Sequence, residues 1–151
     1  GVSGSVAMAC DLIIMSDDAY LYQAFVAIGL IPDGGACWQL VKQLGYRRAL
    51  DCVLQGAKIS AQECLQLGLV NRVVPLDQLQ ASALSWAEEL AQKAPLAMAG
   101  AKKALKKAQN TDLVSAIEIE TEIQAQISES DDVREGIAAF FEKKTPHFNG
   151  R

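Results

Sequence analysis

The residue with the clearest chemical potential is Asp33, which lies in a loop-like segment, residues 29–35, with one Pro and three Gly. A loop carboxylate can act as a general acid or base when a substrate proton lies within reach. The residue types alone favour a simpler role, because Pro-Asp-Gly is a common turn tripeptide and aspartate is a common helix N-cap. On its residues alone, the segment predicts a turn before a helix.

A second segment with possible chemistry is Gly1-Val2-Ser3-Gly4-Ser5, which runs directly into the apolar residues 6–10. Backbone N–H groups at the start of a helix have no partner within the helix and can bind an anionic oxygen. The plainer interpretation is a loop that caps a short helix. The residues alone leave both interpretations open.

The remaining composition excludes several classes of site. The chain has four cysteines without a Cys-x-x-Cys pair, and one histidine. This composition argues against a zinc site, so we expect no metal. We interpret the cysteines as small buried hydrophobes in a reducing compartment, and we expect a cytoplasmic location. The net charge of −4 does not indicate a nucleic-acid partner. No apolar run reaches the roughly 18 residues of a membrane span.

Short strands and helices alternate in the first half of the chain. Apolar runs predict strands over 11–15, 19–22 and 70–74. Helices are predicted over 6–10, 36–44 and 46–54, the last two ending at Gly45 and Gly56. Ser60 and Glu63 have the spacing of a capping box, which predicts another short helix after residue 60.

After Pro75 the pattern is helical to the end. The predicted apolar stripes are Leu79, Ala83, Trp86 and Leu90; Met98, Ala101 and Leu105; Ala116, Ile119, Ile123 and Ile127; and Ile137, Phe140 and Phe141. We expect Trp38, Trp86 and the two phenylalanines to pack, and His147 to be exposed. The predicted strands are too few for a sheet covered on both faces. We therefore expect partner strands from upstream sequence or from another copy.

The order of these segments resembles the enoyl-CoA hydratase/isomerase family, also called the crotonase superfamily. Four stretches carry the resemblance: the glycine-rich loop and Ala-Cys-Asp ending of 1–11, the Gly-x-x-Pro loop of 28–35, the Gly-x-x-Ile-Ser-Ala-x-Glu stretch of 56–73, and the Arg-Glu-Gly-Ile to Pro-x-Phe stretch of 134–148. The resemblance implies an α/β fold, with the later turns of a crotonase-like ββα spiral in residues 1–75. It implies a C-terminal helical trimerisation region in residues 76–151.

The resemblance also implies catalytic residues. Members of the family stabilise the enolate of an acyl-CoA thioester with two backbone N–H donors. One donor aligns with Val2, and the other would lie outside this chain. The two glutamates that activate water in the family's hydratases align with Ser5 and Phe25. Asp33 matches the position of the single carboxylate of the family's isomerases, such as Δ3-Δ2-enoyl-CoA isomerases and the ring-opening isomerases of phenylacetate breakdown.

Binding residues follow from the same resemblance. Ser5, Phe25 and Ile28 would line the substrate pocket, and Lys143 would bind CoA near its adenine end. The implied partners are an acyl-CoA substrate and further copies of the chain in a homotrimer or dimer of trimers. No cofactor is implied, because CoA is part of the substrate. The lysines of the helix after Pro95 are expected to form a solvated face; they are Lys102, Lys103, Lys106 and Lys107.

Three hypotheses of function remain open at this point. The first is an enoyl-CoA isomerase that uses Asp33 as its acid/base. The second is a hydratase, another acyl-CoA lyase or a thioesterase of the same fold. The third is a truncated, non-catalytic assembly module whose helices trimerise without forming an active site.

Overall fold

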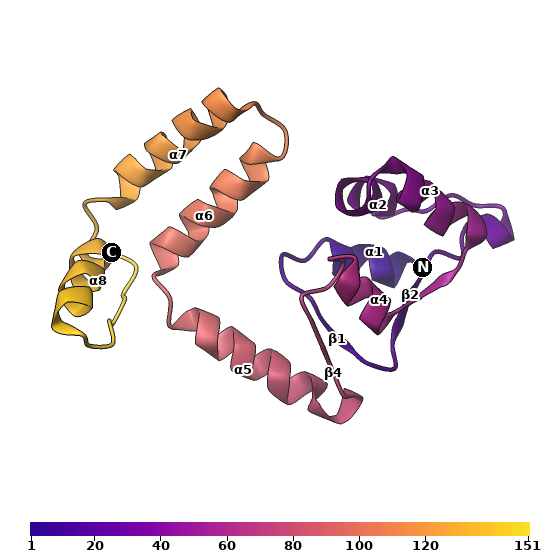
Figure 1. Ribbon diagram of the computed structural model, residues 1–151, viewed down its shortest axis with the longest axis horizontal. Helices are drawn as coiled ribbons and strands as arrows, with labels where there is room; N and C mark the ends of the chain where they lie inside the picture. The colour runs from indigo at the N-terminus through magenta and orange to yellow at the C-terminus, as the bar shows by residue number, and fades with distance from the viewer. The chain divides into compact units, whose positions relative to one another are not determined.

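Short strands and helices alternate through the first part of the computed structural model, and the remainder is helical (Figure 1). The structure describes residues 1–151 and divides into a first unit, Gly1–Leu84, and a second unit, Ser85–Arg151. The first unit contains α1 (Val2–Met8), β1 (Ile14–Ser16), β2 (Tyr20–Tyr22), η1 (Val26–Ile28), α2 (Ala36–Leu44), α3 (Tyr46–Gln55), β3 (Lys58–Ser60), α4 (Ala61–Gln66), β4 (Arg72–Val74) and η2 (Leu76–Gln78). Helix α5 (Leu79–Ala91) spans the division, and α6 (Pro95–Ala108), α7 (Leu113–Ile127) and α8 (Asp131–Glu142) follow.

The strands of the first unit form two separate pairs. β1 and β4 are parallel, with Met15 opposite Val73, whereas β2 and β3 are antiparallel, with Leu21 opposite Ile59. The side chain of Asn71 extends the parallel pair, because its Oδ1 accepts a hydrogen bond from the Ile13 N–H at 2.8 Å. The strands predicted at 11–15, 19–22 and 70–74 correspond to β1, β2 and β4, each only three residues long, whereas β3 is a strand that the sequence did not predict.

A single apolar core holds these elements together. Its buried members come from α1, α2, α3, β3, α4 and the segment before β4; they are Met8, Ala36, Leu40, Ala49, Ile59, Cys64, Leu69 and Val70. Leu40 of α2 has no exposed surface. Burial of these side chains removes apolar area from water, which is the main favourable term in folding. The core fixes α1 and α2, the two helices nearest to the candidate site.

The predicted helix boundaries agree closely with the structure in this unit, with one exception. The helix expected over 36–44 is α2, and Gly45 and Gly56 both adopt positive φ after their helices. Ser60 caps α4, since its Oγ accepts a hydrogen bond from the Glu63 N–H at 3.3 Å. The exception is α1, which begins at Val2 rather than at residue 6. The Gly- and Ser-rich segment is therefore helical.

In the second unit, α6 and α7 pack closely at a glycine. A Cβ on Gly100 would lie 2.8 Å from Cγ2 of Ile123, so the missing side chain permits the approach of the two helices. The stripe predicted for α7 is confirmed, because Ala116, Ile119, Ile123 and Ile127 are buried or half-buried and the glutamates are exposed. The stripe predicted for α6 is wrong: Met98, Ala101 and Leu105 are exposed.

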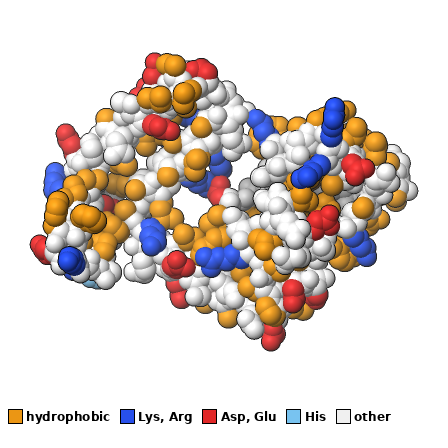
Figure 2. All heavy atoms as spheres, viewed as in Figure 1, with side chains coloured by type: hydrophobic (Ala, Val, Ile, Leu, Met, Phe, Trp, Pro, Cys, Tyr) orange, Lys and Arg blue, Asp and Glu red, His pale blue; other side chains and the backbone are white.

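Several large apolar side chains expected to pack are exposed. Trp38 is 52% exposed, and Phe140 and Phe141 are 79% and 77% exposed. The two phenylalanines contact each other edge to face, with ring centroids 5.7 Å apart. Figure 2 shows hydrophobic side chains on the surface of the α7 and α8 helices. The expectation that these three side chains pack is therefore wrong.

The tail after α8 folds back onto the start of that helix. The buried Asp132 carboxylate accepts hydrogen bonds from the backbone N–H groups of Asn149 and Gly150, at 2.7 and 3.0 Å. The Arg151 carbonyl accepts from the Asp131 N–H at 2.7 Å. The last of these bonds occupies an N–H group at the helix start that the helix itself cannot satisfy. His147 is exposed in this tail, as expected. No helix of either unit is long and apolar enough to cross a membrane.

Candidate active site

The candidate site is built where the Asp33 loop rests on α1. A Cβ on Gly34 would lie 3.1 Å from the Cβ of Ser5 and 3.4 Å from Cγ2 of Val2. Gly34 has φ +59°, a conformation that favours glycine. The absence of a side chain at position 34 thus lets the loop lie directly on the first turns of α1. The structure brings together Val2, Ser5 and the loop of Asp33.

Helix α1 is itself placed by a second close approach. A Cβ on Gly4 would lie 2.7 Å from Cδ1 of Leu21 in β2, so α1 sits tightly against that strand. Ser5 is completely buried by these contacts, whereas Val2 is 54% exposed. The start of α1 therefore offers accessible backbone N–H groups. Its buried second turn offers an enclosed hydroxyl, that of Ser5.

Asp33 itself lies in a turn but does not cap the following helix. Its carbonyl accepts a hydrogen bond from the Ala36 N–H at 3.1 Å, which confirms the predicted turn. The N-cap of α2 is Gly35, with φ +83°, and no side chain makes a cap hydrogen bond there. Since Asp33 is exposed and its carboxylate is not used as a cap, the N-cap interpretation does not explain this residue.

The two apolar residues expected at the site belong to the segment that leads to the Asp33 loop: Phe25 is the N-cap of η1, and Ile28 is its last residue. Phe25 is half-buried at the start of η1, and its carbonyl accepts hydrogen bonds from the N–H groups of Ile28 and Leu30 at 3.1 and 2.9 Å. Ile28 is 72% exposed. Positions 5 and 25 carry no carboxylate. Among the positions that the resemblance assigns to catalysis, Asp33 is therefore the one acidic residue.

Lys143 belongs to the second unit. It is exposed at the C-cap of α8 and has φ +55°, the one non-glycine residue of the chain with positive φ. The left-handed conformation reverses the chain there and begins the tail that returns to Asp132. The conformation of Lys143 is therefore tied to the path of the tail.

The cysteines divide into two groups. Cys64 is buried and Cys52 half-buried, and burial raises the pKa of both thiols. Cys10 and Cys37 are exposed, so the expectation that all four would be buried was wrong for these two. All four are free thiols, and no group of three or more His, Cys, Asp and Glu side chains is placed to hold a metal ion.

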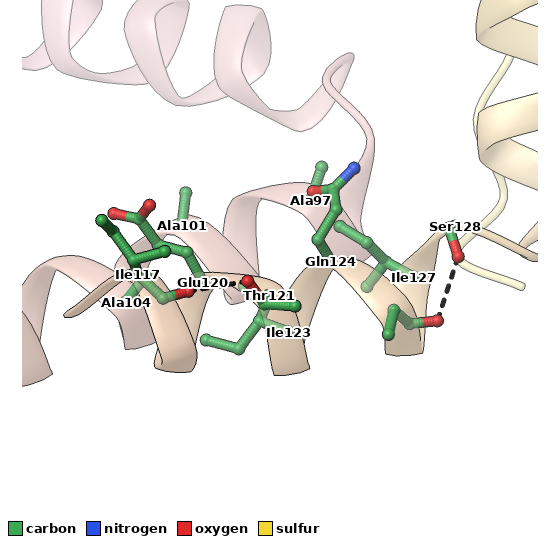
Figure 3. Close-up of a pocket in the computed structure, with 12 residues that line it drawn as sticks. Ala97, Ala101, Ala104, Ile117, Glu120, Thr121, Ile123, Gln124, Ile127 and Ser128 are labelled. Carbon is green, nitrogen blue, oxygen red and sulfur yellow. Dashed lines mark hydrogen bonds between the residues drawn. The ribbon is translucent and has the colours of Figure 1, made fainter. Parts of the chain in front are cut away.

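A separate groove lies between α6 and α7 in the second unit (Figure 3). It has a volume of about 740 Å³, with small side chains from α6, such as Ala101, and longer ones from α7, such as Glu120 and Gln124. Thr121 and Ser128 satisfy their hydroxyls by donating to carbonyls of α7 itself, at 2.8 and 3.0 Å. The groove is open and holds no catalytic combination of residues.

The sequence offered weak signals for two polar residues that the structure singles out. Gln23 is 1% exposed, and neither its Oε1 nor its Nε2 has a hydrogen-bond partner. Its only signal is an amide within an otherwise apolar segment. Asp132 anchors the tail, but an aspartate in the first turn of a helix is usual and predicts nothing about the tail.

The fold is that of an α/β protein in which the loop of Asp33 lies on the first turns of α1. Comparisons with known proteins identify its relatives. The sequence matches the family description Enoyl-CoA hydratase/isomerase over residues 3–151. A probable enoyl-CoA hydratase of Rhodobacter capsulatus is 36% identical over the whole chain. The 1,2-epoxyphenylacetyl-CoA isomerase of Escherichia coli is 31% identical, also over the whole chain. A crystal structure of an enoyl-CoA hydratase from Polaromonas sp. JS666 matches 99% of the chain and 58% of its own length, with a TM-score of 0.95 and 33% identity.

The chain belongs to the enoyl-CoA hydratase/isomerase family, and its fold is part of the crotonase fold. It spans 59% of the Rhodobacter relative and 58% of the Escherichia isomerase. The resemblance expected from the four sequence stretches is thus confirmed at the level of family and fold. The relatives carry both hydratase and isomerase names, so the family alone does not decide the reaction.

Proposed function

We propose that the protein is an enoyl-CoA isomerase in which Asp33 is the single acid/base. The observation that supports this proposal is the close approach of Gly34 to Val2 and Ser5 on α1, because Gly34 directly follows Asp33, whose carboxylate caps no helix. Within the family, that helix start is where the thioester oxygen is expected to bind. A base there lies near the acidic carbon next to the thioester.

In the proposed reaction, the Asp33 carboxylate removes a proton from C2 of a 3-enoyl-CoA. The electron pair of that C–H bond delocalises toward the thioester, and the Val2 N–H donates a hydrogen bond to the oxygen that becomes negative. The protonated Asp33 then returns the proton to C4, so the double bond moves from C3–C4 to C2–C3. One carboxylate suffices, because the same group takes and returns the proton. Neither a metal nor a redox cofactor takes part in these steps.

Exchange of the C2 proton with solvent deuterium tests this proposal. We expect Asp33→Asn to lower the exchange rate and the isomerisation rate of a 3-enoyl-CoA about 10²–10⁴-fold, the usual contribution of a general base. Asp18→Asn, in the exposed turn before β2, is the matched control and should leave both rates unchanged. Full activity in Asp33→Asn would show that another group is the base.

Hydration is the second candidate reaction, because the Rhodobacter relative carries the name of a probable hydratase. Ser5 and Phe25 stand where the resemblance puts the hydratase carboxylates, so this chain has a carboxylate at neither position. Crotonyl-CoA and a 3-enoyl-CoA offered side by side distinguish the reactions. Faster addition of water to crotonyl-CoA would reject the isomerase proposal.

The proposal extends to binding and assembly. We propose that Lys143, exposed at the end of α8, contacts CoA, and that the exposed apolar faces of α7 and α8 associate with other copies of the chain as a homotrimer or dimer of trimers. Sedimentation of the full-length protein tests the assembly, and a monomer at micromolar concentration would contradict it. Lys143→Ala should raise KM for acyl-CoA and leave kcat within about twofold. The free thiols support a reducing, cytoplasmic location.

A further inference from the structure

Ser5 carries a buried hydroxyl that has no partner. Its side chain is completely enclosed, and Oγ makes no hydrogen bond with any atom of the chain. A buried polar group without a partner destabilises a folded protein. An alanine would fill almost the same space without this cost, so the hydroxyl needs an explanation other than packing.

The position of the hydroxyl supplies that explanation. Ser5 Oγ lies 3.7 Å from the point that a Cβ on Gly34 would occupy, and Gly34 directly follows Asp33. The hydroxyl is therefore enclosed beneath the loop that carries the proposed base. The Asp33 carboxylate, for its part, caps no helix. An unpaired donor on α1 thus lies close to the loop residue that directly follows Asp33, whose carboxylate is not used as a cap.

We infer that Ser5 is a positioning residue for Asp33. When an acyl-CoA is bound, the Ser5 hydroxyl donates a hydrogen bond to the Asp33 carboxylate, directly or through one water molecule. The bond holds the carboxylate toward the start of α1 and favours its charged, proton-accepting form. No covalent bond changes. This inference rests on the proposed function, because it assigns Ser5 a role only through Asp33.

Few other ionisable groups adjoin this pair. Helix α1 carries none, and neither does η1. Helix α2, which continues from the loop, carries Cys37 in its first turn and Lys42 in its last. The Cys37 Sγ lies 3.8 Å from the Pro32 carbonyl oxygen, to which it donates. The hydroxyl of Ser5 is consequently the one enclosed donor that α1 presents to the loop of Asp33.

The test is Ser5→Ala in the full-length protein, assayed by exchange of the C2 proton of a 3-enoyl-CoA. We expect kcat to fall about tenfold, with KM within about twofold, because the lost bond orients the base rather than the substrate. The acidic limb of the pH–rate profile should move to higher pH by about half a unit to one unit. Tm should stay equal or rise, because a buried unpaired hydroxyl is removed. Ser5→Cys, a weaker donor, should give an intermediate rate.

Ser3→Ala, at an exposed serine of the same helix, is the control and should change neither rate nor pH profile. Two results would overturn the inference while leaving the proposed function intact: an unchanged kcat in Ser5→Ala when Asp33→Asn is inactive, or a lower kcat together with a lower Tm and an unmoved acidic limb. An active Asp33→Asn would instead remove the proposed function itself, and the role of Ser5 with it.

Discussion

The two units of this chain differ in how they are held together. The first unit has a core of buried side chains from five elements and the segment before β4, among them Leu40 and Ala36, which have no exposed surface. In the second unit the buried residues are few, and Leu113 and Phe140 are more than 70% exposed. Its order comes instead from the Gly100 contact of α6 with α7 and from the tail bonds of Asp132.

This difference matches the two roles proposed for the units: catalysis in the first unit and association with other copies in the second. A carboxylate used in catalysis needs a fixed position, and the Asp33 loop gains one by resting on α1, which the first unit's core holds. Large exposed apolar side chains on helices are typical of interfaces between proteins. The core of the first unit supports the proposal that it is a scaffold for the site, and the exposed side chains of α7 and α8 support the proposal that the second unit associates with other copies of the chain.

Loss of a core side chain should affect the first unit most. Leu40→Ala removes a completely buried side chain and should lower the free energy of unfolding by about 2–5 kcal/mol. Leu105→Ala, at a residue of the second unit that is 69% exposed, should change it by less than about 0.5 kcal/mol. Chemical denaturation of both variants measures the difference. Equal losses would mean that Leu105 is covered in the assembled protein.

Loss of the tail anchor should affect the second unit by a smaller amount. Asp132→Ala leaves the N–H groups of Asn149 and Gly150 without their acceptor, which we expect to cost about 1–3 kcal/mol. Hydrogen exchange at those two amides should accelerate. Asp131→Ala is the control, because its exposed ion pair with Arg134, at 2.6 Å, contributes at most about 1 kcal/mol. Unchanged exchange in Asp132→Ala would show that the tail is held by other contacts.

The sequence predicted elements better than faces, for a physical reason. Local signals sufficed for α2 and for the Ser60 cap, since helix ends depend on residues within one turn. Helix α6 has apolar or small residues on more than one face, so periodicity alone did not show that Gly100 makes the contact. Close approach at a glycine depends on the residues of both helices, so the apolar pattern of one helix does not predict it.

The candidate site shows the same division. The turn at Asp33 was predicted from its residues. The choice of Asp33 as the candidate acid/base came from the family resemblance. The burial of Ser5 and its contact with Gly34 did not, because these residues are far apart in the sequence and meet only through tertiary packing. Two small residues were the only available signal, and they are equally typical of loops.

The smallest expected effect concerns the cap of α7 in the second unit. The Asp112 carboxylate accepts hydrogen bonds from the N–H of Ser115, the hydroxyl of Ser115 and the N–H of Val114, at 3.1, 2.8 and 2.9 Å. These bonds, chiefly that from the Ser115 N–H, lower the pKa of Asp112 below its ordinary value. A carboxyl whose pKa is lowered by folding stabilises the folded state above its unfolded pKa, and the contribution disappears as pH falls through the folded pKa.

Asp112→Ala should therefore lower the Tm of the second unit slightly at pH 7, and the difference from the unchanged protein should narrow as the pH falls into the acidic range. Thr111→Ala, at the exposed neighbouring residue, should show no such pH dependence. Thermal melting followed by circular dichroism across the acidic range measures both variants. Because Asp112 is fully exposed, a large loss of stability could not arise from its cap alone. Such a loss would mean that the start of α7 is buried against another subunit. The stability of the second unit would then depend on buried side chains, as that of the first unit does.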